Sequence, residues 1–225
     1  MTHLDAETEQ LKESVVQMMV LVKNQCKKSI EAFINKDDAL AREVVRNEAR
    51  VNAMELSIDR DCEDIFALFQ PVASNLRFVL AMLKINFHLE RMGDHANGIA
   101  EYALDIEVPI KREHIESIRF MEMVELADSM MDDILEALIN GDTKTARKVF
   151  KKDTDMNLIN KDASRVISEI VKTEPDAIRN ALFLFTTIRK LERIGDLCTN
   201  VAEEIIFHQE AEVLKHNKKR KRTRQ

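Results

Sequence analysis

A thirteen-residue stretch occurs twice in this chain and limits the folds that it can adopt. Residues 89–101 are LERMGDHANGIAE and residues 191–203 are LERIGDLCTNVAE, with seven identical positions. A weaker match, at an offset of 105, relates AREVVRNEARVN (residues 41–52) to ARKVFKKDTDMN (residues 146–157). Two matches at nearly the same offset indicate the duplication of one unit. They predict two similar halves related by an approximate twofold axis.

Residues that interrupt helices are rare, with four Gly and three Pro among 225 residues. The candidate breaks fall near residues 35–38, 71, 108–109, 140–142 and 175. They leave six helical patterns of roughly 25–35 residues, a length typical of antiparallel bundles. We therefore predict an all-α fold of two tandem three-helix bundles, residues 1–108 and 109–210, followed by a basic tail at residues 211–225.

Several classes of protein are disfavoured by the composition. No apolar stretch approaches the roughly 18 residues of a membrane span. The N-terminus, MTHLDAETEQLKES, lacks the pattern of a signal peptide, so we predict a cytoplasmic protein. Cys26, Cys62 and Cys198 are widely spaced and odd in number, which predicts buried core residues rather than disulfides or a zinc knuckle.

Charge is distributed unevenly along the chain. The last eleven residues, KHNKKRKRTRQ, contain seven Lys or Arg and no acid, whereas the remainder has 27 basic and 40 acidic residues, a net charge of −13. An acidic body argues against a broad nucleic-acid surface, so we predict no nucleic-acid partner. The basic tail has two interpretations: a solvated chain end, or a contact with anionic lipid or an acidic partner.

The repeated stretch has two distinct faces when it is placed on a helix. At about 100° per residue its apolar residues form one stripe, which predicts the core face. Its acids form a second stripe roughly 150° away, so that Glu90 with Asp94, and Glu192 with Asp196, face outward or into a groove. A solvated face is the simplest interpretation. However, acids at i and i+4 repel each other, and both copies keep them.

Glycine recurs in both copies although it costs about 1 kcal/mol relative to alanine in a helix interior. Gly93 and Gly195 lie between the core stripe and the acidic stripe. A missing Cβ there predicts the close approach of a neighbouring helix. Such an approach would bring acids from two helices within reach of one ion.

The second helix of each unit offers further oxygen ligands. In the first unit these are Glu48, Asn52, Glu55 and Asp59, spaced by four, three and four residues. In the second unit, Asp153 and Asn157 take the positions of Glu48 and Asn52. Oxygen donors favour Mg²⁺, Mn²⁺, Ca²⁺ or iron, and no Cys or His cluster indicates zinc. A ferritin-like di-iron site needs Glu-x-x-His on two helices, a pattern that this sequence lacks.

The paired LER[IM]GD motifs, together with R-N-E-x-x-V-N-x-M-E-x-x-I-D at residues 46–59, resemble the PhoU family of bacterial regulators of phosphate uptake. The resemblance covers roughly residues 10–208. It implies two similar three-helix bundles whose E(D)-x-x-x-D motifs hold multinuclear iron or zinc in some members. By position, we predict a transition metal cluster of iron, zinc or manganese on these ligands: Glu48, Asn52, Glu90, Asp94, Asp153, Asn157, Glu192 and Asp196.

The second half departs from the first in its acids. Asn160 and Ser164 stand where the first half has Glu55 and Asp59. The second predicted site therefore has fewer carboxylates. We expect it to bind metal more weakly.

The resemblance also implies a regulatory activity without catalysis. Members associate with the ATP-binding subunit of the phosphate ABC transporter and with a membrane sensor histidine kinase, and they repress the phosphate-starvation response when phosphate is plentiful. We further expect a homodimer. The alternatives are a metal-dependent phosphohydrolase and a PhoU-like regulatory domain related to sodium–phosphate cotransporters. The first is disfavoured because the chain has no Gly-rich phosphate loop and no evident nucleophile beside the acids.

Overall fold

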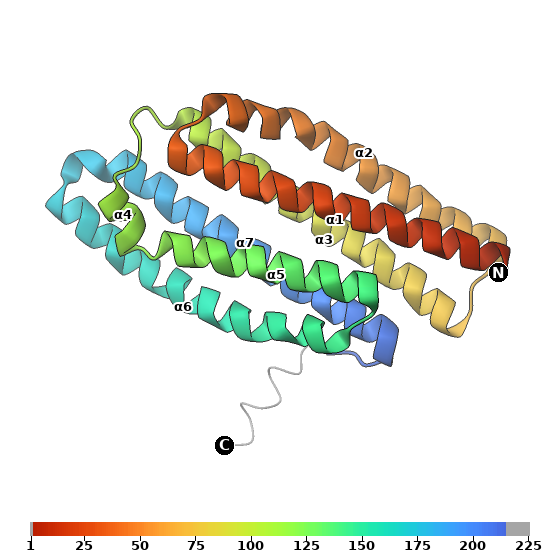
Figure 1. The fold of residues 1–225 in the computed structure, drawn as a ribbon. Helices are drawn as coiled ribbons and strands as arrows, with labels where there is room; N and C mark the ends of the chain where they lie inside the picture. The colour runs from red at the N-terminus through yellow and green to blue at the C-terminus, as the bar shows by residue number, and fades with distance from the viewer. Residues whose placement is uncertain (1, 215–225) are drawn as a thin grey trace, which may run out of the picture.

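The structure, a computed structural model, describes residues 2–214, and within this range it is helical and without strands. Six helices are long: α1 (His3–Asn35), α2 (Asp38–Phe69), α3 (Ala73–Asp105), α5 (Phe120–Asn140), α6 (Thr143–Thr173) and α7 (Ile178–Glu210). The short helix α4 (Arg112–Ser117) and the 3₁₀ turn η1 (Pro175–Ala177) lie in the connections. The prediction of an all-α fold with two tandem three-helix bundles is confirmed (Figure 1).

Helix ends reproduce the duplication. Asp37 and Asp142, equivalent at the 105-residue offset, are the N-caps of α2 and α6, and each accepts a hydrogen bond from a backbone amide in the first turn. The residue before each cap is left-handed, with φ of 54° at Lys36 and 65° at Gly141. A glycine there is free of strain, and the first copy adopts the same conformation without one.

The fourth predicted helix is interrupted. It divides into α4 and α5 around Arg119, whose φ is 56°. On one continuous helix, Ile118 and Phe120 would point about 200° apart, so they could not share a core. The turn lets both be buried, and Phe120 stacks on Phe33 of α1 at a centroid distance of 5.8 Å.

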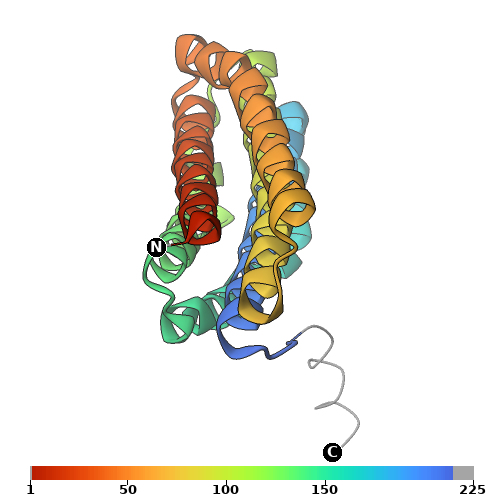
Figure 2. The same cartoon turned by 90° about the vertical axis from the view of Figure 1, so that its right-hand side faces the viewer.

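The two bundles pack side by side through α3 and α7, which run antiparallel along the middle of the molecule (Figure 1). Figure 2 shows the fold turned by 90°, with α1 (red) and α2 (orange), which contact each other, joined at the top of the view. Lys84 of α3 and Glu204 of α7 join the halves at 3.1 Å, and Glu204 is only 2% exposed. Lys23 of α1 forms ion pairs with Asp128 and Asp132 of α5 on the same seam.

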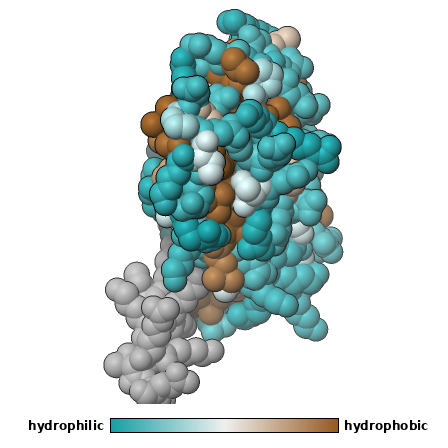
Figure 3. All heavy atoms as spheres, turned by 90° about the vertical axis from the view of Figure 1, so that its left-hand side faces the viewer, coloured by the Kyte–Doolittle hydropathy of each residue, from teal (hydrophilic) through white to brown (hydrophobic). Residues whose placement is uncertain are grey.

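The core is apolar and the outer surface is polar. Cys26, Cys62 and Cys198 are buried and free, as predicted. Figure 3 shows that the end of the molecule carrying α4 is mainly hydrophilic, with apolar side chains in small groups. Among the described helices, none has a segment both long enough and apolar enough to span a bilayer.

Candidate functional site

The predicted ligands of the first half come together at the α2–α3 contact. Burial raises the pKa of Glu48, as does the charge of Asp94 from the opposite helix, while a hydrogen bond with Asn52 opposes this shift. Burial also raises the pKa of Glu90, together with the charges of Asp94, Glu55 and Glu48. Carboxylates from two helices therefore repel one another across this face.

One further acid of the second helix is engaged elsewhere. The Nδ2 of Asn86, a buried residue of α3, donates to Oδ1 of Asp59 and to the backbone oxygen of Glu55, each at 2.9 Å. These bonds fasten α2 to α3. Asp59 is thus a structural acceptor, in contrast to Glu48 and Glu90.

The second half has a related cluster between α6 and α7. Asp153 is 4% exposed and accepts a hydrogen bond from Nδ2 of Asn157 at 3.2 Å. Burial raises the pKa of Glu192, as do the charges of Asp196 and, to a smaller extent, Asp153. Arg193 lies 3.1 Å from Asp196 and 3.8 Å from Glu192, so a cation of the chain itself accompanies these acids.

The two clusters differ in how well their chemistry suits a metal ion. Mutually repelling carboxylates in the first half would be stabilised by a bound divalent cation. In the second half, the guanidinium of Arg193 already supplies positive charge. Across residues 2–214, no three His, Cys, Asp or Glu side chains lie in a geometry that could hold a metal ion. The donor chemistry of the first cluster fits a cation, but its side chains would have to turn to bind one.

The repeated glycines lie where the helices of each bundle touch. A Cβ on Gly93 would lie 3.0 Å from Cγ1 of Val51 in α2, and one on Gly195 would lie 2.7 Å from Sδ of Met156 in α6. Val51 and Met156 are equivalent at the 105-residue offset. The close approach predicted from the sequence is present in both halves, and it is made against apolar side chains beside the acids.

Gly98 has a different neighbour, on the other bundle. A Cβ at this position would lie 2.3 Å from Nζ of Lys190 in α7. The second copy has Asn200 at the equivalent place. Gly98 therefore makes room for a lysine of the opposite half, which explains why only one copy of the repeated stretch has a second glycine.

A groove with a volume of about 580 Å³ lies between α3 and α7. Both motif arginines, Arg91 and Arg193, line it. The other residues of its wall are Phe87, His88, His95, Asp196, Leu197, Thr199 and Asn200. Burial lowers the pKa of His95 to about 4, as do the positive charges of Lys190, Arg91 and Arg193. The groove thus gathers Arg91 and Arg193, one from each half, on a wall that also carries Asp196.

Comparison with known proteins follows the same division of the chain. The family model described as the PhoU domain matches residues 15–103 and again residues 120–205. The chain belongs to the PhoU family. Its relatives include the phosphate-specific transport system accessory protein PhoU homolog of Aquifex aeolicus, 35% identical over 93% of this chain and 94% of that protein. The phosphate-specific transport system accessory protein PhoU of Escherichia coli is 30% identical over 94% of this chain and 87% of that protein.

Two solved PhoU structures share the fold. The crystal structure of PhoU from Pseudomonas aeruginosa has a TM-score of 0.85 at 30% identity, and covers 93% of this chain and 100% of that one. The crystal structure of the phosphate transport system regulatory protein PhoU from Streptococcus pneumoniae has a TM-score of 0.82 at 27% identity. The match covers 94% of this chain and 99% of that one. The names of these relatives describe accessory and regulatory proteins, in agreement with the prediction that this member of the family is not an enzyme.

Sequence reasoning missed the role of the arginine in the PhoU repeat. Arg91 and Arg193 occupy the same position in the two copies of the motif. A helical wheel of one copy, however, cannot show which residues of another helix lie beside them. Only the antiparallel packing of α3 on α7 brings both to the same groove. Their identity in both copies was the signal that could have drawn attention to them.

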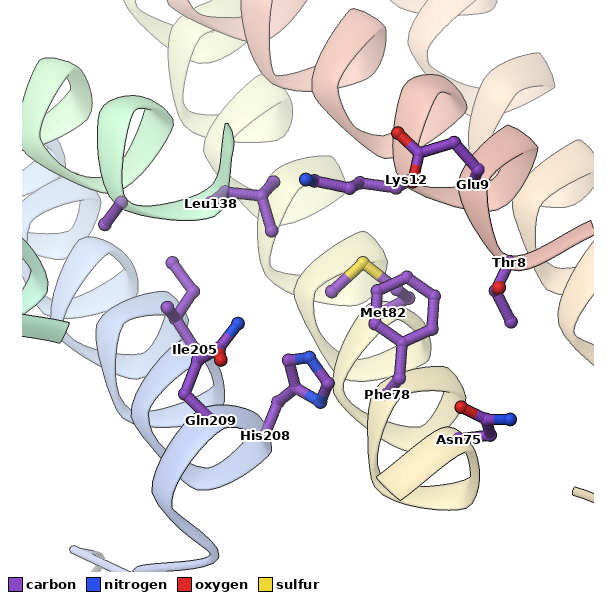
Figure 4. Close-up of a pocket in the computed structure, with 11 residues that line it drawn as sticks. Thr8, Glu9, Lys12, Asn75, Phe78, Met82, Leu138, Ile205, His208 and Gln209 are labelled. Atoms are coloured by element: carbon purple, nitrogen blue, oxygen red, sulfur yellow. The ribbon is translucent and has the colours of Figure 1, made fainter. Parts of the chain in front are cut away.

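A second, smaller cavity of about 250 Å³ lies at the end of the PhoU fold where α1, α3, α5 and α7 meet (Figure 4). Its apolar wall includes Phe78 and Met82, and the ring of His208 lies against Phe78 with centroids 5.1 Å apart. Burial lowers the pKa of His208, together with the charges of Arg77 and Lys12. The cavity is thus amphipathic, and its surroundings favour the neutral form of the histidine.

Proposed function

We propose that the protein is a regulatory accessory protein of phosphate transport. The observation that carries the proposal is similarity over nearly the whole chain: the Aquifex aeolicus relative, named for this role, aligns with 93% of it. Both repeats match the PhoU domain, so neither half has been replaced by another module. The proposal includes a cytoplasmic location, which fractionation of cells would test, and a homodimeric state, which light scattering on the purified protein would test.

The proposed partners are the ATP-binding subunit of the phosphate ABC transporter and a membrane sensor histidine kinase. Asp94 is exposed and Glu48, Glu90, Glu192 and Asp196 are partly exposed, and these acids, in a body with a net charge of −13, suit reversible contact with a basic surface. The Debye length, over which dissolved salt screens charges, falls from about 10 Å at 0.1 M salt to about 3 Å at 1 M. Association through these acids should weaken accordingly as salt is raised.

Deletion of the gene in the source organism tests the function. We expect phosphate-starvation genes to be expressed despite ample phosphate. Silent genes and a normally regulated transporter in the deletion strain would contradict the regulatory assignment.

Affinity capture from phosphate-replete cells tests the partners. We expect the Glu90→Gln/Asp94→Asn variant to recover less of the transporter subunit and kinase than the wild type. Glu63→Gln/Asp64→Asn is a matched control, because it makes the same change in charge at two exposed acids of α2 outside the cluster. An equal loss in both variants would show that overall charge, and not the cluster, mediates recognition.

We also infer that the first acidic cluster binds a divalent transition metal ion. Support comes from the raised pKa values of Glu48 and Glu90, which mutual repulsion helps to maintain. Elemental analysis after metal-free purification and reconstitution should detect stoichiometric metal. The Glu90→Gln/Asp94→Asn variant should lose more of it than the Glu192→Gln/Asp196→Asn variant does. Absence of metal from the reconstituted wild type would overturn this inference.

A further inference from the structure

The groove between α3 and α7 combines residues from both halves of the duplication. Arg91 and Arg193 occupy the same position of the repeated motif, 102 residues apart in the chain. They line one groove because α3 and α7 pack antiparallel. A single unit of the repeat could not form this site. Its volume of about 580 Å³ lies within the range of small-molecule sites, roughly 300–1,000 Å³.

The positive charge of the groove is only partly neutralised by the chain. Asp196 lies on the wall and pairs with Arg193 at 3.1 Å. Within residues 2–214, Arg91 has no carboxylate within the 4.0 Å of an ion pair. Its guanidinium lies instead over the half-exposed ring of Phe87, 5.6 Å from the centroid. Since no described carboxylate forms an ion pair with it, the guanidinium of Arg91 remains available to an anionic ligand.

Two more features favour an anion over a neutral ligand. Lys190 enters from α7 against Gly98 of α3, so a third cation lies at the contact between these two helices. Polar groups without formal charge also line the wall, among them the side chain of Asn200. Planar guanidinium groups with amide and imidazole donors are typical of oxyanion recognition, because they offer several N–H groups to one set of oxygens.

We propose that this groove binds a phosphate-type oxyanion, with Arg91 as its principal ligand and Arg193 as a second donor on the opposite wall. The oxyanion is either free orthophosphate or the phosphate group of a nucleotide. A nucleotide has the size to occupy more of the groove, with its base against the exposed ring of Phe87. This site is separate from the carboxylates proposed to bind metal. It does not depend on the regulatory function.

Isothermal titration calorimetry on chelator-treated, metal-free protein at low salt tests the proposal. Orthophosphate and ATP are titrated separately into the full chain. We expect saturable binding of at least one, with a stoichiometry of one per chain. If orthophosphate binds, free phosphate is a sufficient ligand for the groove. If ATP binds and orthophosphate does not, the ligand is a nucleotide. If neither binds, the proposal is wrong.

Three variants attribute the binding to the groove. Arg91→Met should weaken it at least about tenfold, and Arg91→Lys should weaken it less because the charge is kept. Arg189→Met is the matched control: this exposed arginine of α7 also lies over a phenylalanine, Phe185, but does not line the groove. Circular dichroism would verify the fold of each variant. Unchanged affinity in Arg91→Met, or equal loss in Arg189→Met, would overturn the proposal.

Discussion

Alanine at the two repeated glycines should change stability in opposite directions. The new methyl group at position 93 would lie 3.0 Å from Cγ1 of Val51, whereas at position 195 it would lie 2.7 Å from Sδ of Met156. Val51 is β-branched and fully buried in a helix, so it has essentially one rotamer and cannot turn away. Met156 is unbranched and flexible, so its sulfur can move. Gly93→Ala therefore requires α2 to shift, but Gly195→Ala only requires a side chain to shift.

The magnitudes follow from two opposing effects. Replacing a mid-helix glycine by alanine gains about 1 kcal/mol of helix propensity. Overpacking a rigid core contact costs typically about 1–3 kcal/mol. For Gly93→Ala the cost exceeds the gain, and we expect a net loss of about 1 kcal/mol. For Gly195→Ala, moving the side chain of Met156 costs less than moving a helix, so we expect the free energy of unfolding to rise by up to about 1 kcal/mol. For a chain of this length, each 1 kcal/mol corresponds to about 2–4 °C in Tm.

Urea denaturation followed by circular dichroism would measure both changes. Val51→Ala completes a double-mutant cycle with Gly93→Ala: because the smaller side chain removes the clash, the double variant should be more stable than the sum of the single effects predicts. A Gly93→Ala protein as stable as the wild type, or equal shifts for both glycines, would refute the close-contact argument.

Other perturbations test the pH dependence, the seam between the halves and the tail. The pKa of His95 in the folded protein, about 4, lies below the usual 6.5 of a histidine. The stability that the neutral side chain contributes is therefore present above pH 6.5 and is lost as the pH falls towards 4. In the His95→Leu variant, which has the residue found at the equivalent position of the second copy, Tm should fall less between pH 7 and pH 5 than it does in the wild type. Lys84→Met should lower the free energy of unfolding in urea by about 1–3 kcal/mol because the buried carboxylate of Glu204 loses this ion pair, and should cost less when Glu204→Gln is also present. Residues 215–225 lie outside the described residues. Of the two interpretations of this basic tail, contact with anionic lipid predicts that its deletion reduces sedimentation with anionic vesicles while leaving Tm unchanged, whereas a solvated chain end predicts no change in sedimentation.

The helix boundaries were largely predictable because local signals set them. Asp37 and Asp142 cap helices, Gly141 ends one, and Pro71 follows another. The interruption at Arg119 was missed because nothing in the sequence indicates that an arginine will adopt the left-handed backbone conformation. It exists because residues on either side of it are buried in the same core, and that depends on helices elsewhere in the chain.

The candidate site divides in a similar way. Helical spacing was sufficient to place Glu90 beside Asp94 and to put the acids of each half on one face. It could not show that Asp59 is bound by Asn86, or that the second cluster has Arg193 as a counterion. Such contacts depend on which side chains meet between helices, and periodicity within one helix does not specify that.

By itself, the sequence determined the helices, the duplication and the acidic face of each unit, because periodicity, capping and internal repeats act over short range or by direct comparison. Only the tertiary structure decided what the two units form together. Antiparallel packing of α3 on α7 places Arg91 and Arg193 on one groove and brings Lys190 against Gly98. The physical reason is that contacts between residues about a hundred positions apart depend on how two finished helices fit against each other.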